Sequence, residues 1–271
     1  MISDIKEIKD NENNHTDPES ENEINSVNSD DESEMTFLEH LEEFRWRLIR
    51  SAIGVVIGGI IVGIFITWIM DNILLLPAQQ TTPPLKLQNI KPFGQFSLYM
   101  EVIIVGGIIL SIPNIIYQFW KFIEPALKPS ESKYIKSIVI YSSICFLSGI
   151  VFAYFVMLPT ALEFFANFGS SVIDNIIAVD EYFSFIISTM LAAGLVFELP
   201  MVSFFLSKIG ILKPEFMKKY RKHAIVLILL IAGILTPSPD ITSQLLLAGP
   251  LFVLYEVSII ICKISQKKTA K

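Results

Sequence analysis

The chain has 271 residues, of which 52% are hydrophobic and only 18% are charged, and its formal net charge is −6. A soluble domain needs nearer a quarter charged residues to cover its surface. Together with a mean hydropathy of +0.55, this composition excludes an ordinary soluble domain and predicts a protein whose solvent is the bilayer. The two cysteines, Cys145 and Cys262, lie far apart in apolar runs and indicate neither a disulfide framework nor a metal site.

The chain begins with an acidic tail. Residues 1–34 are rich in Asp, Glu, Asn and Ser and contain few apolar side chains. Such a composition cannot offset the entropy lost on ordering, so we expect this tail to be disordered. It has the pattern of neither a secretory signal peptide nor an arginine-rich organelle transit peptide. Their absence favours the prokaryotic cell membrane over a plastid or mitochondrion.

Long apolar runs predict an all-α membrane protein with six transmembrane helices. The expected membrane domain covers residues 35–264, and a basic tail follows at 265–271. Pro113, Pro200 and Pro250 fall within the runs and predict kinks in the helices that carry them. The runs place the spans at about 49–70, 97–120, 137–158, 182–207, 222–236 and 243–262.

The positive charges predict the orientation of these spans. Lys and Arg gather before the first run, after the last, and in alternate connections, whereas the other connections are nearly bare of them. Because cytoplasmic connections carry the excess of Lys and Arg, both termini are expected in the cytoplasm. The first outer connection contains four prolines, which predicts a rigid, turn-rich loop; they are Pro77, Pro83, Pro84 and Pro92.

An amphipathic helix is expected just before the first span. Thr36 and Glu39 have the spacing of a capping box, and an apolar stripe that includes Phe44 fits a helix at the inner membrane interface. Glu39 and Glu43 are like charges four residues apart, which slightly destabilise an isolated helix. A local cost of this kind hints at function, although a charged helix start with local ion pairs fits the pattern equally well.

Carboxylates also occur where membrane packing alone does not require them. Glu198 lies inside the fourth run, where a carboxylate costs roughly 3 kcal/mol and must face protein or water. It serves either as an inter-helix hydrogen-bonding group or as a polar substrate or proton site, and the pattern leaves both open. Glu256 lies nearer the cytoplasmic end and is read as structural. Glu124 and Glu131 sit among lysines, where a solvated loop explains them as well.

Chemistry-bearing motifs of enzymes are missing from the sequence. It contains no zinc-binding pair of histidines at i,i+4, no Gly-x-Ser-x-Gly and no P-loop. We therefore expect no enzyme activity, no catalytic residues, no metal site and no cofactor.

Taken together, the motifs resemble those of the TatC family, the core membrane subunits of the twin-arginine protein translocase. The similarity runs from about residue 35 to residue 262, and the motifs occur in the family's order. They are HLEEFRWRL at 40–48, YQFWKFIEPAL at 117–127, FAYFV at 152–156, FELP at 197–200, LTPSPD at 235–240 and PLFVLYE at 250–256.

The resemblance implies a receptor for signal peptides that carry two adjacent arginines. It assigns peptide binding at the cytoplasmic face to Glu43 and Glu131, with Arg45 and Phe122 beside them. Partner docking and buried polar contacts fall to Glu198, Thr236 and Gln244, and Pro77 has a structural role in the first outer loop. These positions are matched motif by motif.

The resemblance also implies partners. They are single-span proteins of the TatA and TatB type and further copies of the chain in a larger complex, with no nucleic acid. The assembly exports folded proteins across the prokaryotic cell membrane and uses the proton motive force. A different class of function, a proton-coupled transporter of small solutes that uses Glu198, is the alternative; the spans show no internal repeat of the kind many such transporters have.

Overall fold

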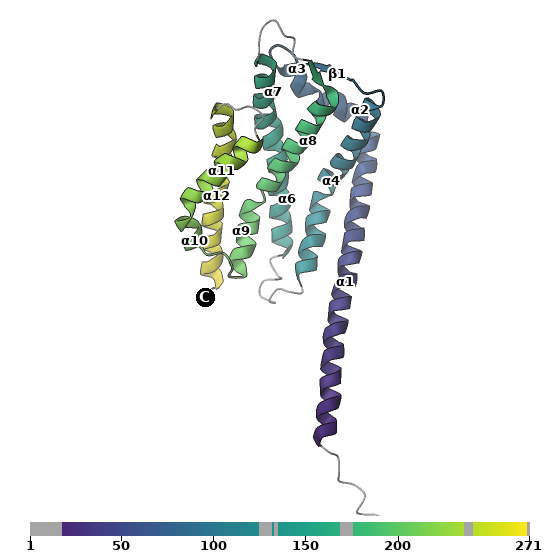
Figure 1. Cartoon of the computed structure of the whole chain (residues 1–271), viewed down its shortest axis with the longest axis vertical. Helices are drawn as coiled ribbons and strands as arrows, with labels where there is room; N and C mark the ends of the chain where they lie inside the picture. The colour runs from purple at the N-terminus through teal and green to yellow at the C-terminus, as the bar shows by residue number, and fades with distance from the viewer. Residues whose placement is uncertain (1–17, 125–131, 133–134, 169–175, 236–240, 270–271) are drawn as a thin grey trace, which may run out of the picture. The chain divides into compact units, whose positions relative to one another are not determined.

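The computed structural model describes residues 18–124, 132, 135–168, 176–235 and 241–269 (Figure 1). Most of these residues are helical. Two compact units divide the chain inside its first helix: the first unit ends at Leu48, and the second covers Ile49–Lys271. The two units are described separately.

Helix α1 (Pro18–Ile64) begins inside the acidic tail. Residues 18–34 are therefore helical, whereas their composition predicts disorder. The sequence offers a reason, because proline is favoured at the first helical position and acidic residues are favoured near a helix N-terminus. Residues 1–17 lie outside the described part of the chain, and the tail boundary at residue 34 stays a prediction.

The second unit continues through α1 into a folded segment at residues 66–93, called the outer segment after the side of the membrane predicted for it. A short helix α2 (Ile66–Ile69) is followed by the π-helical turn η1 (Met70–Leu74) and by α3 (Leu76–Gln80). Helix α4 (Gly94–Ile123) then returns across the unit and continues through Pro113. The first outer connection is thus folded into short elements, as its prolines indicate.

The central helices are interrupted at two places. Helix α6 (Ile135–Phe152) runs through the π-helical turn η3 (Ala153–Met157) into α7 (Leu158–Asn167). Helix α8 (Val179–Val196) is separated from α9 (Leu199–Lys208) by a turn just before Pro200. This break confirms the kink predicted there, because proline cannot donate the hydrogen bond that a continuous helix needs.

Three helices complete the unit: α10 (Pro214–Lys219), α11 (Arg221–Leu235) and α12 (Ile241–Thr269). Helix α12 continues through Pro250. Within the second unit, α10 and the end of α12 lie at one end, and α3 and β1 lie at the other (Figure 1). Tyr255 ties the first of these ends together, because its hydroxyl donates to the carbonyl of Met217 at 2.8 Å.

Five helical segments in the described part of the chain are long and apolar enough to cross a membrane. They are His40–Ile64, Gly94–Ile123, Ile135–Asn167, Val179–Lys208 and Ala248–Ser265. Their outward side chains are apolar: Ile64 is 72% exposed and Leu195 is 69% exposed. Soluble monomers rarely expose large apolar patches, so these faces suit lipid. The predicted span at 222–236 corresponds to α11, whose 15 residues are fewer than the roughly 20 that cross the hydrocarbon of a bilayer.

The expectation of an all-α protein needs one correction. Strand β1 (Lys86–Gln88) pairs in parallel with β2 (Ile176–Ala178), and Leu87 lies opposite Ile177. The two strands belong to different outer connections. Pairing satisfies backbone groups that would otherwise lack partners beside an apolar environment, which explains a small sheet in a helical protein.

One of the buried hydrophobic clusters of the second unit lies beneath this outer segment. Leu98, Leu158, Tyr182 and Phe183 are almost completely buried there. Two tyrosine hydroxyls tie the segment to the helices: Tyr154 donates to the carbonyl of Ile73 at 2.9 Å, and Tyr182 donates to that of Leu74 at 2.7 Å. The outer connection is therefore anchored on the spans.

Glycines allow two pairs of helices to approach closely. A Cβ added at Gly107 of α4 would lie 2.7 Å from the amide nitrogen of Gly59 in α1. A Cβ added at Gly149 of α6 would lie 2.7 Å from the carbonyl oxygen of Ala193 in α8. Small residues at such crossings let membrane helices pack backbone to backbone.

Candidate functional site

Glu43 already accepts a guanidinium within its own helix. The Nε of Arg47 donates to Glu43 Oε1 at 3.0 Å, and a terminal nitrogen of the same guanidinium donates to the same oxygen. The other carboxylate oxygen lies 3.9 Å from Nδ1 of His40. The pair has its acidic member four residues before the basic one, which is the favourable order in a helix. The Glu43 side chain remains 34% exposed.

Of the other residues assigned to peptide binding, the structure describes Arg45 and Phe122 but not Glu131. Arg45 is exposed on α1, and Phe122 is half-buried near the end of α4. On either side of Phe122 in the sequence, Lys121 and Glu124 form an ion pair. Glu131 lies outside the described residues, and Glu43 and Phe122 belong to different units. Their predicted grouping around two arginines therefore stays a prediction.

Glu198 lies at the turn between α8 and α9 and contacts a neighbouring helix. The hydroxyl of Ser142 on α6 donates a hydrogen bond to Glu198 Oε2. The second oxygen, Oε1, is buried and has no partner among the described residues. A buried polar atom without a partner is costly, so this group is a candidate for contact with a partner or substrate. Ser142 carried no signal in the sequence, since it is one of several serines in an apolar run.

Gln244 joins the last two helices. Its side-chain nitrogen on α12 donates to the carbonyl of Leu229 on α11 at 2.9 Å. This carbonyl belongs to the interior of α11, so Gln244 adds a polar contact on a short apolar helix. Thr236, which was assigned to the same surface, lies outside the described residues.

Pro77 is buried in the first turn of α3. Just beyond it, the Thr81 hydroxyl donates to the carbonyl of Ala78 at 3.0 Å and accepts from the amide of Leu85 at 3.1 Å. The amide of Thr82 donates to Glu163 of α7 at 3.2 Å. Pro77 thus precedes a segment whose backbone is hydrogen-bonded from both sides, and its own structural role stays a prediction.

Two ion pairs join elements that are distant in sequence. Arg221 at the start of α11 bonds Glu256 of α12 at 2.8 Å, which agrees with a structural reading of Glu256. Lys91 bonds Asp180 at the start of α8. The hydrogen bond and the charge of Asp180 raise the pKa of Lys91 above its ordinary value. Neither pairing could be read from the sequence, because no periodic pattern links the two partners.

Comparison with known proteins identifies the family. The model of the family described as "Sec-independent protein translocase protein (TatC)" matches residues 39–250. The TatC protein of Carboxydothermus hydrogenoformans is 42% identical over 234 residues, which cover 86% of this chain and 95% of the relative. The TatC protein of Aquifex aeolicus is 36% identical over 236 residues, which cover 86% of this chain and 97% of the relative.

A solved structure agrees with the sequence comparisons. The crystal structure of the protein described as "Twin Arginine Translocase Receptor- TatC" superposes with a TM-score of 0.70 at 36% identity and covers 84% of this chain and 99% of that chain. Both relatives named above are bacterial proteins. With five apolar helices in the described residues, these matches confirm the predicted multi-pass location in the prokaryotic membrane. The chain therefore belongs to the TatC family and is a component of the Sec-independent, twin-arginine protein translocase.

Proposed function

We propose that the chain is the signal-peptide receptor of its translocase and binds two adjacent arginines at its cytoplasmic face. The observation that supports this most directly is the Glu43 carboxylate, which already holds the guanidinium of Arg47. The superposed crystal structure is that of a protein described as a translocase receptor, which supports the same role. With partners of the TatA and TatB type, the complex exports folded proteins and draws on the proton motive force.

Arginine is recognised better than lysine at such a site for a geometric reason. A guanidinium is a planar fork that forms two parallel, charge-assisted hydrogen bonds to a carboxylate, whereas an ammonium acts as a point charge. Two arginines need two carboxylates, which we assign to Glu43 and Glu131. Arg45 and Phe122 complete the site beside them.

Six spans with both termini in the cytoplasm are part of the same proposal. The fifth span is α11, whose 15 residues reach only about 22 Å at 1.5 Å per residue, against roughly 30 Å of hydrocarbon. A span shorter than the hydrocarbon is accommodated by partner helices that shield it or by local thinning of the bilayer. We assign this docking surface to Thr236 and Gln244, with Glu198 as a buried polar contact, and we expect several copies of the chain in one complex.

Peptide binding to the purified full-length protein tests the receptor. Removing one charge-assisted hydrogen bond costs about 1.5 kcal/mol or more, so Glu43→Ala or Glu131→Ala should weaken the Kd for a twin-arginine peptide about tenfold. Glu42→Ala is the matched control, because Glu42 is an exposed carboxylate on the same helix. Normal binding by the Glu43→Ala/Glu131→Ala double variant would rule out the proposed site.

A further inference from the structure

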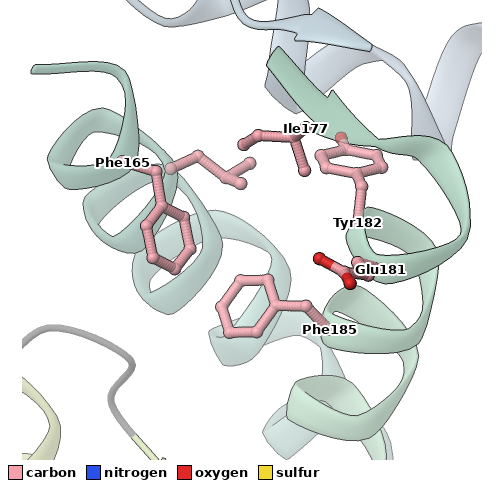
Figure 2. A pocket seen from close by; sticks show the side chains of 6 residues that line it. Phe165, Ile177, Glu181, Tyr182 and Phe185 are labelled. Atoms are coloured by element: carbon pink, nitrogen blue, oxygen red, sulfur yellow. The ribbon is translucent and has the colours of Figure 1, made fainter. Parts of the chain in front are cut away.

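The second unit contains a hollow that the receptor function does not use. It lies between α7 and α8 beneath β2, and its volume is about 290 Å³. Figure 2 shows Ile177, Tyr182 and the rings of Phe165 and Phe185 around it, with the carboxylate of Glu181 turned toward the same space. Leu162 completes the lining. The walls are therefore apolar and aromatic, with one acidic group.

The walls are held by contacts to the neighbouring segment and to one another. Tyr182 is 2% exposed, and its hydroxyl is committed to the carbonyl of Leu74. The rings of Phe165 and Phe185 meet edge to face, with 5.6 Å between their centroids. Side chains held in this way keep the space open without a ligand, which reduces the ordering cost of binding.

Glu181 is the group in this hollow that can select a ligand. Its side chain is exposed, and no hydrogen bond or ion pair to it occurs among the described residues. The nearby cation, Lys91, forms its ion pair with Asp180, and the charge of Glu181 acts on it only from a greater distance. A carboxylate beside aromatic rings favours a cation, because the ring faces carry negative potential. The same carboxylate disfavours a headgroup that has a phosphate and no cationic group.

The position of the hollow indicates where such a cation comes from. Helix α7 ends the candidate span Ile135–Asn167, and α8 begins the candidate span Val179–Lys208. The hollow thus lies where both candidate spans end, and a span of the hydrocarbon ends at the layer of lipid headgroups. Aromatic side chains are enriched at this depth, and exposed Phe168 and Ile176 extend the apolar surface beside the hollow.

We propose that this hollow binds the ethanolamine headgroup of a phospholipid from the leaflet on the side of α3 and β1. The primary ammonium donates hydrogen bonds to Glu181 and lies against the rings of Phe165 and Phe185. The glycerol and the upper acyl carbons contact the apolar walls. With the topology proposed above, this is the non-cytoplasmic leaflet, so the lipid site is independent of the signal-peptide site.

Lipid retention by the purified full chain tests this assignment. The protein is placed in nanodiscs that contain equal amounts of phosphatidylethanolamine and phosphatidylglycerol, and the lipids kept after release are identified by native mass spectrometry. We expect the wild-type chain to keep phosphatidylethanolamine in at least fivefold excess. Glu181→Gln, which keeps the shape of the side chain, should remove that excess, whereas Asp71→Asn should not; Asp71 is an exposed carboxylate of η1 outside the hollow.

Further measurements distinguish phosphatidylethanolamine from other ligands of the hollow. Replacing phosphatidylethanolamine by phosphatidylcholine, whose headgroup has no N–H donor, should lower retention severalfold. Equal retention of phosphatidylethanolamine and phosphatidylglycerol by the wild type, or an unchanged excess in Glu181→Gln, would overturn the proposal. A photoreactive residue at position 165 that cross-links to a partner protein instead of lipid would also overturn it. Binding of a twin-arginine peptide should be unchanged in Glu181→Gln, which keeps this result separate from that of the proposed receptor function.

Discussion

The hydrogen bond from Ser142 to Glu198 provides a quantitative test of polar packing inside the spans. Ser142 is 4% exposed on α6, and its hydroxyl meets a carboxylate at the turn between α8 and α9. Hydrogen bonds between membrane helices are worth on average about 0.6 kcal/mol and at most about 1.7 kcal/mol. Because Glu198 has one oxygen that already lacks a partner in the described residues, we expect Ser142→Ala to cost about 1 kcal/mol of unfolding free energy.

A double-mutant cycle isolates this contact. Glu198→Leu removes the acceptor, so Ser142→Ala should cost close to nothing in that background, and the coupling energy should be about 1 kcal/mol. The free energy of unfolding of each variant in the cycle is measured in bicelles by steric trapping. Ser143→Ala is the matched control, since that hydroxyl donates to the carbonyl of Val139 in its own helix at 2.8 Å. An equal cost of Ser142→Ala in both backgrounds would refute the reasoning.

Two further predictions concern helix packing and the outer segment. Gly149→Ala should lower the free energy of unfolding by about 1–3 kcal/mol, because its Cβ would lie 2.7 Å from the carbonyl oxygen of Ala193. Gly249→Ala is the control, because its Cβ would meet nothing within 4 Å. An equal loss of unfolding free energy in both variants would contradict this prediction. The pKa of Lys91 is raised by Asp180, so its stabilising contribution is fully present below about pH 10.5 and is lost as pH rises through the raised pKa. Spin labels at Gln88 and Ala178, which are partners in the strand pair, should therefore gain mobility at strongly alkaline pH, and Lys91→Gln should show that mobility already at neutral pH. An unchanged pH response in Lys91→Gln would exclude Lys91 as its source.

Several features of the fold could be predicted from local sequence patterns. Apolar runs located the five long candidate spans, because burial in lipid needs about twenty consecutive apolar residues whatever the neighbours are. Pro200 marked the break between α8 and α9, since the missing N–H is a property of the residue itself. The family motifs then indicated the TatC family before any contact was known.

Other features were decided by contacts between distant segments. The pairing of β1 with β2 joins two outer connections, and neither strand has enough length to be recognised alone. Glu198 was visible as a carboxylate inside a span, but its bond to Ser142 depends on how α6 and α8 are rotated against each other. Hydropathy is nearly blind to that rotation, because both helices are apolar on most faces.

The acidic residues show which properties follow from local sequence and which follow from tertiary contacts. The sequence by itself determined which carboxylates lie within spans and which lie beside lysines, since those are facts of local order along the chain. The ion pair of Glu43 with Arg47 is local, since the two residues lie four apart in one helix. Only the tertiary structure decided the other environments: Glu256 holds Arg221, and Glu181 faces an aromatic hollow. The physical reason is that a charge is stabilised by whatever group packing brings within a few ångströms, and that group is often far away in the sequence.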